Sequence, residues 1–315
     1  MKIYNHIDDF VKISNAVVTI GTFDGVHIGH QKIIARLLEV ARQKKGETVI
    51  LTFFPHPRMI LHPEDHEIKL ISTMSEKAER LEKLGIDHLI ITPFTRDFSN
   101  LSPQDYIKNV LVDKIGTKQI IIGYDHRFGK DREGGMKHLQ KFSSDFNFEV
   151  EEIPEQDIND VAVSSTKIRS AILCGDVKTA HDFLGYLFHL TGKVIKGDQI
   201  GRTLGFPTAN LFVEETYKLI PADGIYAVSV KMKTRAVAKT YNGMAYIGHR
   251  PTINGMTHNI EVNIFDFHED IYGANIQINF HHFIREDEKF LSLETLKAQL
   301  AKDEIAVRNI LIQKA

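Results

Sequence analysis

Cysteine and tryptophan are nearly absent from this sequence: its 315 residues include one Cys and no Trp. A lone thiol, Cys174, cannot close an internal disulfide or build a thiolate metal cluster, so no oxidising compartment is required. No run approaches the roughly 20 apolar residues that a membrane-spanning helix needs. Residues 1–14 lack the cationic and apolar segments of a signal peptide. These absences predict a soluble cytoplasmic protein without a membrane partner.

Charge of one sign is not in excess either. Lys and Arg number 39 against 41 Asp and Glu, which gives a formal charge of −2. Because non-specific phosphate binding needs surplus positive charge, no nucleic-acid partner is expected, and any polyanion should be held by a local site. At roughly 100–200 residues per domain, the length indicates about two domains. The sequence leaves the oligomeric state open.

The first half of the chain alternates short β-branched runs with helical patterns. Residues 17–21, 48–54, 88–92 and 119–123 are dense in Val, Ile and Phe, which predicts buried strands. Helices are predicted around residues 33–41, stopping at Gly46, and over residues 75–84 and 102–115. The last of these should open with Ser102 as N-cap and Pro103 in the first turn. This rhythm indicates an α/β doubly wound sheet.

The second half has a different pattern of predicted secondary structure. Strand-like runs at residues 187–195, 226–232, 237–247, 260–267 and 275–284 are separated by Gly, Asp, Asn and Pro, with no helix between them. This pattern suits a small antiparallel β-barrel or sandwich, closed by an amphipathic helix over residues 293–312. We place the domain boundary after a helical stretch at 166–184, which gives domains 1–184 and 185–315.

The most informative segment is GTFDGVHIGH at residues 21–30. It runs from a predicted strand into a predicted helix, where open α/β sheets bind ligands and where helix N-termini favour phosphate. Spacing of i, i+3 would place His27 and His30 on one helical face, where both rings could donate to one phosphate group. Such donors stabilise charge on a phosphorus under attack. A tight turn with satisfied ring nitrogens would explain either histidine alone, but less readily the whole string.

Two further segments could contact a nucleotide. Asp125 follows the predicted strand at 119–123, so its carboxylate could accept from ribose hydroxyls or an adenine amine. Hydroxyl side chains at residues 164–166 stand at a predicted helix start with Arg169 one turn on, which could hold departing pyrophosphate. A plain N-cap is the alternative for either serine taken singly.

In the second half, GRTLGFPTAN at residues 201–210 carries the strongest signal. Thr208 and Asn210 alternate with Ala209 on a predicted strand, so their oxygen-bearing side chains should point the same way. Two neutral oxygens side by side suit Mg²⁺ carrying nucleotide phosphates, and glycines such as Gly197 and Gly201 would let loop amides reach those phosphates. The alternative is an ordinary barrel turn entering a strand.

These segments resemble a known family. GTFDGVHIGH resembles the (H/T)xGH signature of the nucleotidyltransferase superfamily, and in its longer form that of the prokaryotic bifunctional riboflavin kinase/FAD synthetase family. The resemblance extends through LTFFPHP at 51–57, GYDHRFG at 123–129, VSSTKIR at 163–169 and GRTLGFPTAN, then through residues 248–252, 261–263, 270–273 and 283–290. It implies a Rossmann-like nucleotidyltransferase domain followed by a riboflavin kinase barrel.

The resemblance also implies chemistry. Riboflavin would be phosphorylated by ATP to FMN, and FMN adenylylated by a second ATP to FAD, with Mg²⁺ as cofactor. Glu261 would be the base for the ribityl hydroxyl, His27 and His30 would act on the α-phosphate, and Mg²⁺ and ATP would sit at Thr208 and Asn210. The remaining residues expected to bind flavin or nucleotide are Gly21, Phe23, Asp24, Gly29, Pro55, His56, Pro57, Asp125, Arg127, Ser164, Ser165, Thr166, Arg169, Gly197, Gly201, Arg202 and Arg285.

Three positions depart from the family pattern: His126 stands where Phe is common, Lys167 where Arg is common, and Tyr246 where Asn is expected. The last affects the flavin-side loop of the kinase domain, because it directly precedes the segment that resembles IGxRPT. Neither His126 nor Lys167 removes a residue on which the predicted chemistry depends, and the departure at Tyr246 matters more.

Two rival functions come from other classes. Residues 27–30 spell the HIGH tetrad of class I aminoacyl-tRNA synthetases, but a KMSKS-like segment and a basic tRNA-binding surplus are missing, and a synthetase has no need of the kinase segment. A non-catalytic flavin- or nucleotide-binding regulator is the second rival. It would have no reason to keep all of the predicted chemical residues, which are His27, His30, Thr208, Asn210 and Glu261.

Overall fold

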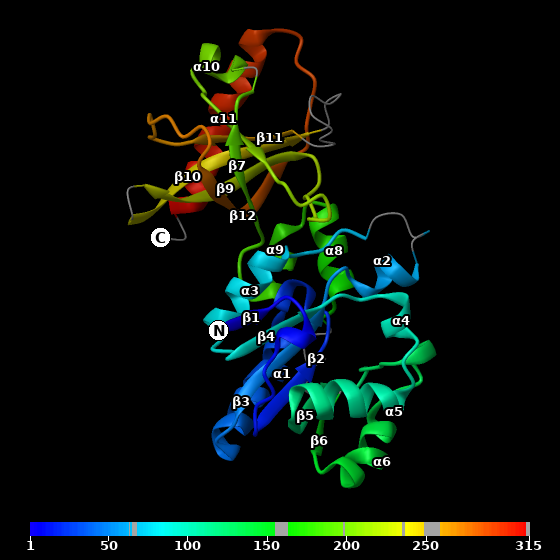
Figure 1. The fold of residues 1–315 in the computed structure, drawn as a ribbon. Helices are drawn as coiled ribbons and strands as arrows, with labels where there is room; N and C mark the ends of the chain where they lie inside the picture. Colours follow the sequence, from blue (N-terminus) through cyan, green and yellow to red (C-terminus); the bar gives the residue numbers. More distant parts are fainter. Residues whose placement is uncertain are drawn as a thin grey trace. The chain divides into compact units, whose positions relative to one another are not determined.

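The computed structural model describes residues 1–62, 64, 68–154, 163–197, 199–234, 237–248 and 259–312. It divides into two compact units, Met1–Ser165 and Thr166–Ala315 (Figure 1). Helices between residues 165 and 184 therefore group with the second unit, and a functional boundary between residues 184 and 185 stays a prediction. No helix in the described ranges is long and apolar enough to span a membrane.

The first unit is built on one parallel sheet. Its strands are β1 (Lys2–Tyr4), β2 (Ala16–Ile20), β3 (Glu47–Phe53), β4 (His88–Thr92), β5 (Thr117–Gly123) and β6 (Glu149–Ile153). They lie in the order β1-β4-β3-β2-β5-β6, and every neighbouring pair is parallel. The chain order reverses between β2 and β5, which is where doubly wound sheets bind ligands beyond the carboxyl ends of their strands.

Helices cover both faces of this sheet. They are η1 (Ile7–Asp9), η2 (Asp24–Val26), α1 (Ile28–Lys44), α2 (Pro57–Leu61), α3 (Met74–Lys83), α4 (Arg96–Ser99), α5 (Pro103–Asp105), the π-helical η3 (Tyr106–Ile115), η4 (Lys130–Arg132) and α6 (Met136–Phe146). Consecutive residues of β2 belong to two different hydrophobic cores, because their side chains point to opposite faces of the sheet. Val18 packs with residues of η3 and α6, whereas Val17 packs with residues of α1 and α3. The predicted doubly wound architecture is confirmed.

Local signals explain where these helices begin and end. Ser102 caps the helical segment that starts at Pro103 by accepting from the backbone N–H of Asp105, as predicted. At the end of α1, however, Lys45 rather than Gly46 takes the left-handed conformation, with φ of 51°. Gly46 is needed for a different reason, because any Cβ there would collide with the backbone oxygen of Asn15.

The second unit begins with two helices and continues as a barrel. Its elements are α8 (Ser165–Leu173), α9 (Val177–Leu184), β7 (His189–Ile195), α10 (Ile200–Leu204), β8 (Ala209–Phe212), β9 (Gly224–Thr234), β10 (Val237–Gly248), β11 (Asn259–Ile264), β12 (Asn275–Arg285) and α11 (Leu293–Ile312). The predicted stretch 166–184 is thus two helices, because Gly175 turns at φ of 81° and Asp176 caps α9.

The barrel closes through β10-β11-β8-β7-β12-β9, and all its strand pairs are antiparallel. Closure removes the sheet edges that would otherwise expose unpaired backbone groups. Helix α11 packs on it through Val307 and Leu311, which share a core cluster with Ala227, Met244 and Phe265 (Figure 1). The predicted barrel with a closing helix is confirmed, with bounds for α11 equal to those expected.

Candidate functional sites

The loop of residues 21–26, which follows the carboxyl end of β2 in the first unit, has a strained backbone conformation. Phe23 and Val26 have φ of 46° and 39°, a region that costs a non-glycine residue about 1–3 kcal/mol. Contacts with the segment before and inside α3 hold this conformation. The buried Asp24 carboxylate accepts from the backbone N–H of Ile71 at 2.9 Å, and the backbone N–H of Gly25 donates to Ser72 Oγ at 3.2 Å.

A buried lysine completes this support. The Nζ of Lys77 on α3 donates to the backbone oxygen of Thr22 at 2.7 Å. Burial lowers the pKa of Lys77 to about 8, and the charge of Asp24 opposes that shift. The ammonium therefore stays protonated at neutral pH and lies beneath the 21–26 loop. Asp24, expected to bind substrate, is 1% exposed and is engaged with these backbone groups.

The two histidines lie together at the start of α1, as their spacing predicts. Their rings stack with centroids 3.7 Å apart at an interplanar angle of 18°. His27 is the N-cap, and its Nδ1 accepts from the backbone N–H of His30 at 3.4 Å. An accepting Nδ1 assigns the proton of neutral His27 to Nε2. The Nδ1 of His30 is buried and has no hydrogen-bond partner among the described residues.

Both histidines are held neutral. Burial lowers the pKa of His27 to about 4, although the nearby Asp24 charge opposes the shift. Burial, together with the charges of His27 and Lys77, lowers the pKa of His30 well below its ordinary value. A neutral imidazole offers one N–H donor, so a phosphate here would meet uncharged donors backed by the Lys77 ammonium.

This neutrality predicts acid sensitivity. The unfolded chain protonates His27 near its ordinary pKa of 6.5, whereas the folded state resists protonation down to about 4. The free energy of unfolding is therefore undiminished by His27 above about pH 6.5, and it falls as the pH drops toward 4. Between pH 7.5 and 5 we expect His27 to contribute a loss of about 2 kcal/mol. In urea unfolding followed by circular dichroism, the free energy of unfolding of His27→Gln should fall by about that much less than that of the wild type over this pH range. Parallel losses in the two proteins would contradict the prediction.

A cavity of about 750 Å³ opens beside this loop. Among the predicted binding residues, those on its wall are Gly21, Phe23, His30, His56, Pro57, Asp125 and Arg127. Apart from His30 on α1, these residues follow the carboxyl ends of β2, β3 and β5, so the topology gathers segments up to about a hundred residues apart. Within the described part of the unit, His27, Asp24, Gly29 and Pro55 are not on that wall.

The cavity has one aromatic and one cationic region. Ring contacts link Phe53 to Phe94 and Phe98, then Phe98 to Tyr106, which stacks on Phe128 at 4.9 Å. Burial raises the pKa of the Tyr106 hydroxyl, which has no partner in the described ranges. The cationic region consists of four arginines, Arg58, Arg96, Arg127 and Arg132. Sequence reasoning missed the aromatic region, since its rings come from four separate segments.

The 123–129 segment owes its shape to a hairpin. Phe128 and Gly134 exchange backbone hydrogen bonds at 3.1 and 2.9 Å. Gly135 leaves the space that the Arg127 guanidinium fills. Ser165 donates to the backbone oxygen of Asp24 at 3.1 Å, so it supports the loop. Thr166 and Arg169 lie in the second compact unit, and their predicted part in this site stays a prediction.

In the second unit, the acidic residue singled out from the sequence lies on the barrel wall. Glu261 on β11 pairs with Asn210 on β8 and with Tyr246 on β10. Directly paired residues share a sheet face. The Glu261 carboxylate accepts from Thr208 Oγ1 at 2.9 Å and from Asn259 Nδ2 at 2.6 Å. Thr208, Asn210 and Glu261 are thus brought together as predicted, whereas Asn259 was missed.

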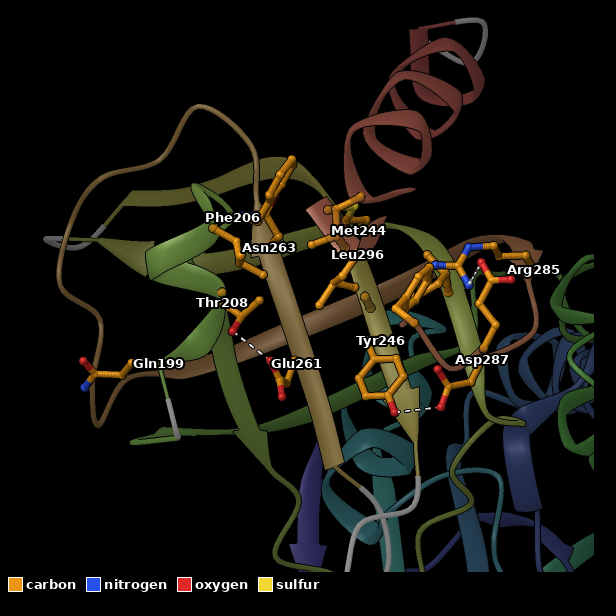
Figure 2. A pocket seen from close by; sticks show the side chains of 17 residues that line it. Gln199, Phe206, Thr208, Met244, Tyr246, Glu261, Asn263, Arg285, Asp287 and Leu296 are labelled. Carbon is orange, nitrogen blue, oxygen red and sulfur yellow. Dashed lines mark hydrogen bonds and ion pairs between the residues drawn. The ribbon is translucent and has the colours of Figure 1, made fainter. Parts of the chain in front are cut away.

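Two cavities meet at this row of side chains. One of about 320 Å³ is lined by Glu261, Gly201, Arg285 and the apolar side chains of Leu204, Phe206, Ile225, Met244, Phe290, Leu296 and Leu300 (Figure 2). The other, of about 470 Å³, is lined by Arg202, Pro207, His268, Asp270 and Tyr272 among others. Thr208 and Gln199 line both. Thr208, which lines both cavities, donates to Glu261 on the wall of the smaller one.

The remaining predicted residues hold the wall in shape. Gly197 packs against the side-chain amide of Asn210 with no room for a Cβ. Arg285 donates to the buried Asp303 of α11 at 2.8 and 3.1 Å, so it fastens β12 to that helix. Residues 249–252, part of the expected flavin-side loop, lie outside the described residues.

Known proteins match both units. The FAD synthetase family model matches residues 10–167, and the riboflavin kinase family model matches residues 184–311. A bifunctional riboflavin kinase/FMN adenylyltransferase from Listeria monocytogenes is 43% identical over 92% of this chain and 90% of its own length. The protein of the same name from Escherichia coli K12 is 36% identical over 93% of this chain and 91% of its own.

A solved structure agrees over the whole length. The crystal structure of a protein from Streptococcus pneumoniae, named there as a macrolide-efflux protein, superposes with a TM-score of 0.86 at 33% identity and covers 98% of both chains. That name belongs to the pneumococcal protein, whereas the matching family models and the two relatives above carry the names of flavin-processing enzymes. This chain belongs to the bifunctional riboflavin kinase/FMN adenylyltransferase family.

Proposed function

We propose that the two reactions of this family take place in the cavities described above: riboflavin phosphorylation where the two barrel cavities meet, and FMN adenylylation beside the stacked histidines. The observation that carries the proposal is the position of Glu261. Its carboxylate accepts from Thr208, a residue on the wall of both barrel cavities, so a base stands where a donor and an acceptor substrate would meet.

The chemistry of the two cavity walls supports one arrangement of the two kinase substrates. The cavity lined by Met244, Phe290 and Leu296 suits the flat apolar ring of riboflavin. The cavity that contains Arg202 and His268 suits ATP. Glu261 then accepts the proton of the terminal ribityl hydroxyl while the oxygen of that hydroxyl bonds to the γ-phosphorus of ATP. The γ-phosphorus bond to the bridging oxygen breaks, and FMN and ADP are the products.

The donor set fits Mg²⁺. Because Thr208 gives its hydroxyl proton to Glu261, the lone pairs of its oxygen are free for a cation, and the Asn210 amide oxygen belongs to the same face. Bound with ATP, Mg²⁺ would neutralise phosphate charge. Mg²⁺ usually retains several waters and takes few protein ligands beside substrate phosphates, so two neutral side-chain oxygens with ATP phosphates would suit it.

Mg²⁺ should therefore bind together with nucleotide. In calorimetry, Mg²⁺ titrated into the nucleotide-free protein should give weak heat, and the same titration with ADP present should give saturable binding. Asn210→Ala should weaken the second titration, because it removes a neutral oxygen ligand. Tight Mg²⁺ binding to the nucleotide-free protein would contradict this assignment.

In the first unit, an FMN phosphate oxygen attacks the α-phosphorus of ATP, and the bond to the bridging oxygen of pyrophosphate breaks. The four arginines of the cavity attract both anions, and the aromatic region suits the isoalloxazine ring. His27 and His30 donate to the α-phosphate as negative charge develops there. Neither step requires a protein nucleophile, because both depend on positioning and charge stabilisation.

One incubation tests the proposal. The protein with riboflavin, ATP and Mg²⁺ should form FMN first and FAD second, separated and quantified by chromatography. Flavin binding without product would favour the non-catalytic regulator. Exchange of pyrophosphate into ATP that depends on an amino acid would favour the synthetase hypothesis instead.

We also propose a cytoplasmic location with small molecules as the partners. The single cysteine means that folding requires no internal disulfide. The net charge of −2 offers no general attraction to nucleic acid or to anionic membranes.

A further inference from the structure

The segment after β12 crosses the apolar cavity of the kinase unit. Within it, Asp287, Glu288 and Phe290 line that cavity, and we call residues 286–290 the strap. Residues 286–289 are exposed, and the following Leu291 is 102% exposed, so burial contributes little to holding the strap in place. Its position must depend on a few directed contacts.

Two side chains supply such contacts. Directly before the strap, Arg285 at the end of β12 bonds to Asp303, forms an ion pair with Glu288 at 3.3 Å and lies over the Phe290 ring at 5.7 Å. From the barrel, the Tyr246 hydroxyl donates to Asp287 Oδ2 at 3.0 Å (Figure 2). The second contact joins residues 41 positions apart in the sequence.

Tyr246 is placed to connect the strap with the chemistry. Its β10 position pairs directly with Glu261, so its ring lies on the cavity wall next to the predicted base. Gly248 leaves space for the hydroxyl end of the ring, since a Cβ there would collide with it. The ring thus forms part of the wall, while its hydroxyl bonds to Asp287 of the strap, which lines the same cavity (Figure 2).

We propose that Tyr246 is a positioning residue of the kinase site, which fastens the strap over the riboflavin ring through Asp287. The inference rests on the proposed function, because it takes this cavity to be the riboflavin site. In this arrangement the strap contacts the ring and not the transferred phosphoryl group. Its contribution to the binding free energy is therefore equal in the ground state and the transition state. Such uniform binding affects KM and leaves kcat nearly unchanged.

The test uses Tyr246→Phe, which removes one oxygen and keeps the ring in the wall. We expect its KM for riboflavin to rise about 5- to 20-fold, the range for loss of one exposed hydrogen bond to a charged group, with kcat within about 2-fold. Asp287→Ala should match it, and the double variant should lose no more than either single variant. Tyr241→Phe is the control, because Tyr241 lies on the same strand but packs against Phe267.

A second measurement keeps the inference separate from the proposed function. Hydrogen exchange followed by mass spectrometry should show faster exchange over residues 286–292 in Tyr246→Phe, without any ligand present. A wild-type protein that neither binds nor phosphorylates riboflavin would overturn the proposed function. Unchanged exchange together with an unchanged KM in Tyr246→Phe, or a loss confined to kcat, would overturn the role given to Tyr246.

Discussion

Glu261→Gln should abolish most FMN formation while FAD synthesis from supplied FMN continues. The amide keeps the size of the side chain, and its single oxygen can still accept from one of the two donors, Thr208 or Asn259, which bond to different oxygens of the carboxylate. It cannot take the ribityl proton. Loss of a general base usually costs roughly 10²–10⁴-fold, and we expect kcat for riboflavin phosphorylation to fall by that amount.

Both activities should be measured in the same preparation by chromatography. Glu214→Gln is a matched control, because it neutralises an exposed carboxylate shortly after β8. It should leave both rates unchanged. Equal loss of the two activities in folded Glu261→Gln protein would contradict the model of two separate sites.

His30→Ala should have the converse effect: FMN should accumulate because FAD synthesis fails. The donor is used mainly when charge develops on the α-phosphorus, so kcat should fall far more than ATP binding weakens. Comparable anion-stabilising donors are worth about 3–4 kcal/mol, which corresponds to a decrease of roughly 10²–10³-fold. Riboflavin phosphorylation should be unaffected, because His30 belongs to the first compact unit.

The control for this variant is His138→Ala, which removes a partly exposed histidine from α6 of the same unit. Its FAD synthesis should match the wild type. If folded His30→Ala protein formed FAD at nearly the wild-type rate, the histidine pair would be only a turn between strand and helix, and we would withdraw its assigned role.

The sequence by itself located many of the elements and pointed to the candidate chemical residues. β-branched runs located β2 to β5, and the amphipathic pattern of residues 293–312 gave α11 with its bounds. The proximity of His27 and His30 was predicted from helical spacing, and in the structure it combines the N-cap position of His27 with the first turn of α1. These features could be predicted because they depend on neighbours within one helical turn or one strand, where backbone geometry fixes which side chains meet.

The tertiary structure alone decided how distant segments complete the sites. Lys77 reaches Thr22 across 55 positions, Thr208 reaches Glu261 across 53, and Arg285 finds its partner in Asp303. The aromatic region around Tyr106 is likewise assembled from separate segments. No local periodicity encodes such pairs, because they form only when sheet order and barrel closure bring distant strands into register. The sequence therefore supplied the candidate reacting groups, and the fold supplied the residues that contact and support them.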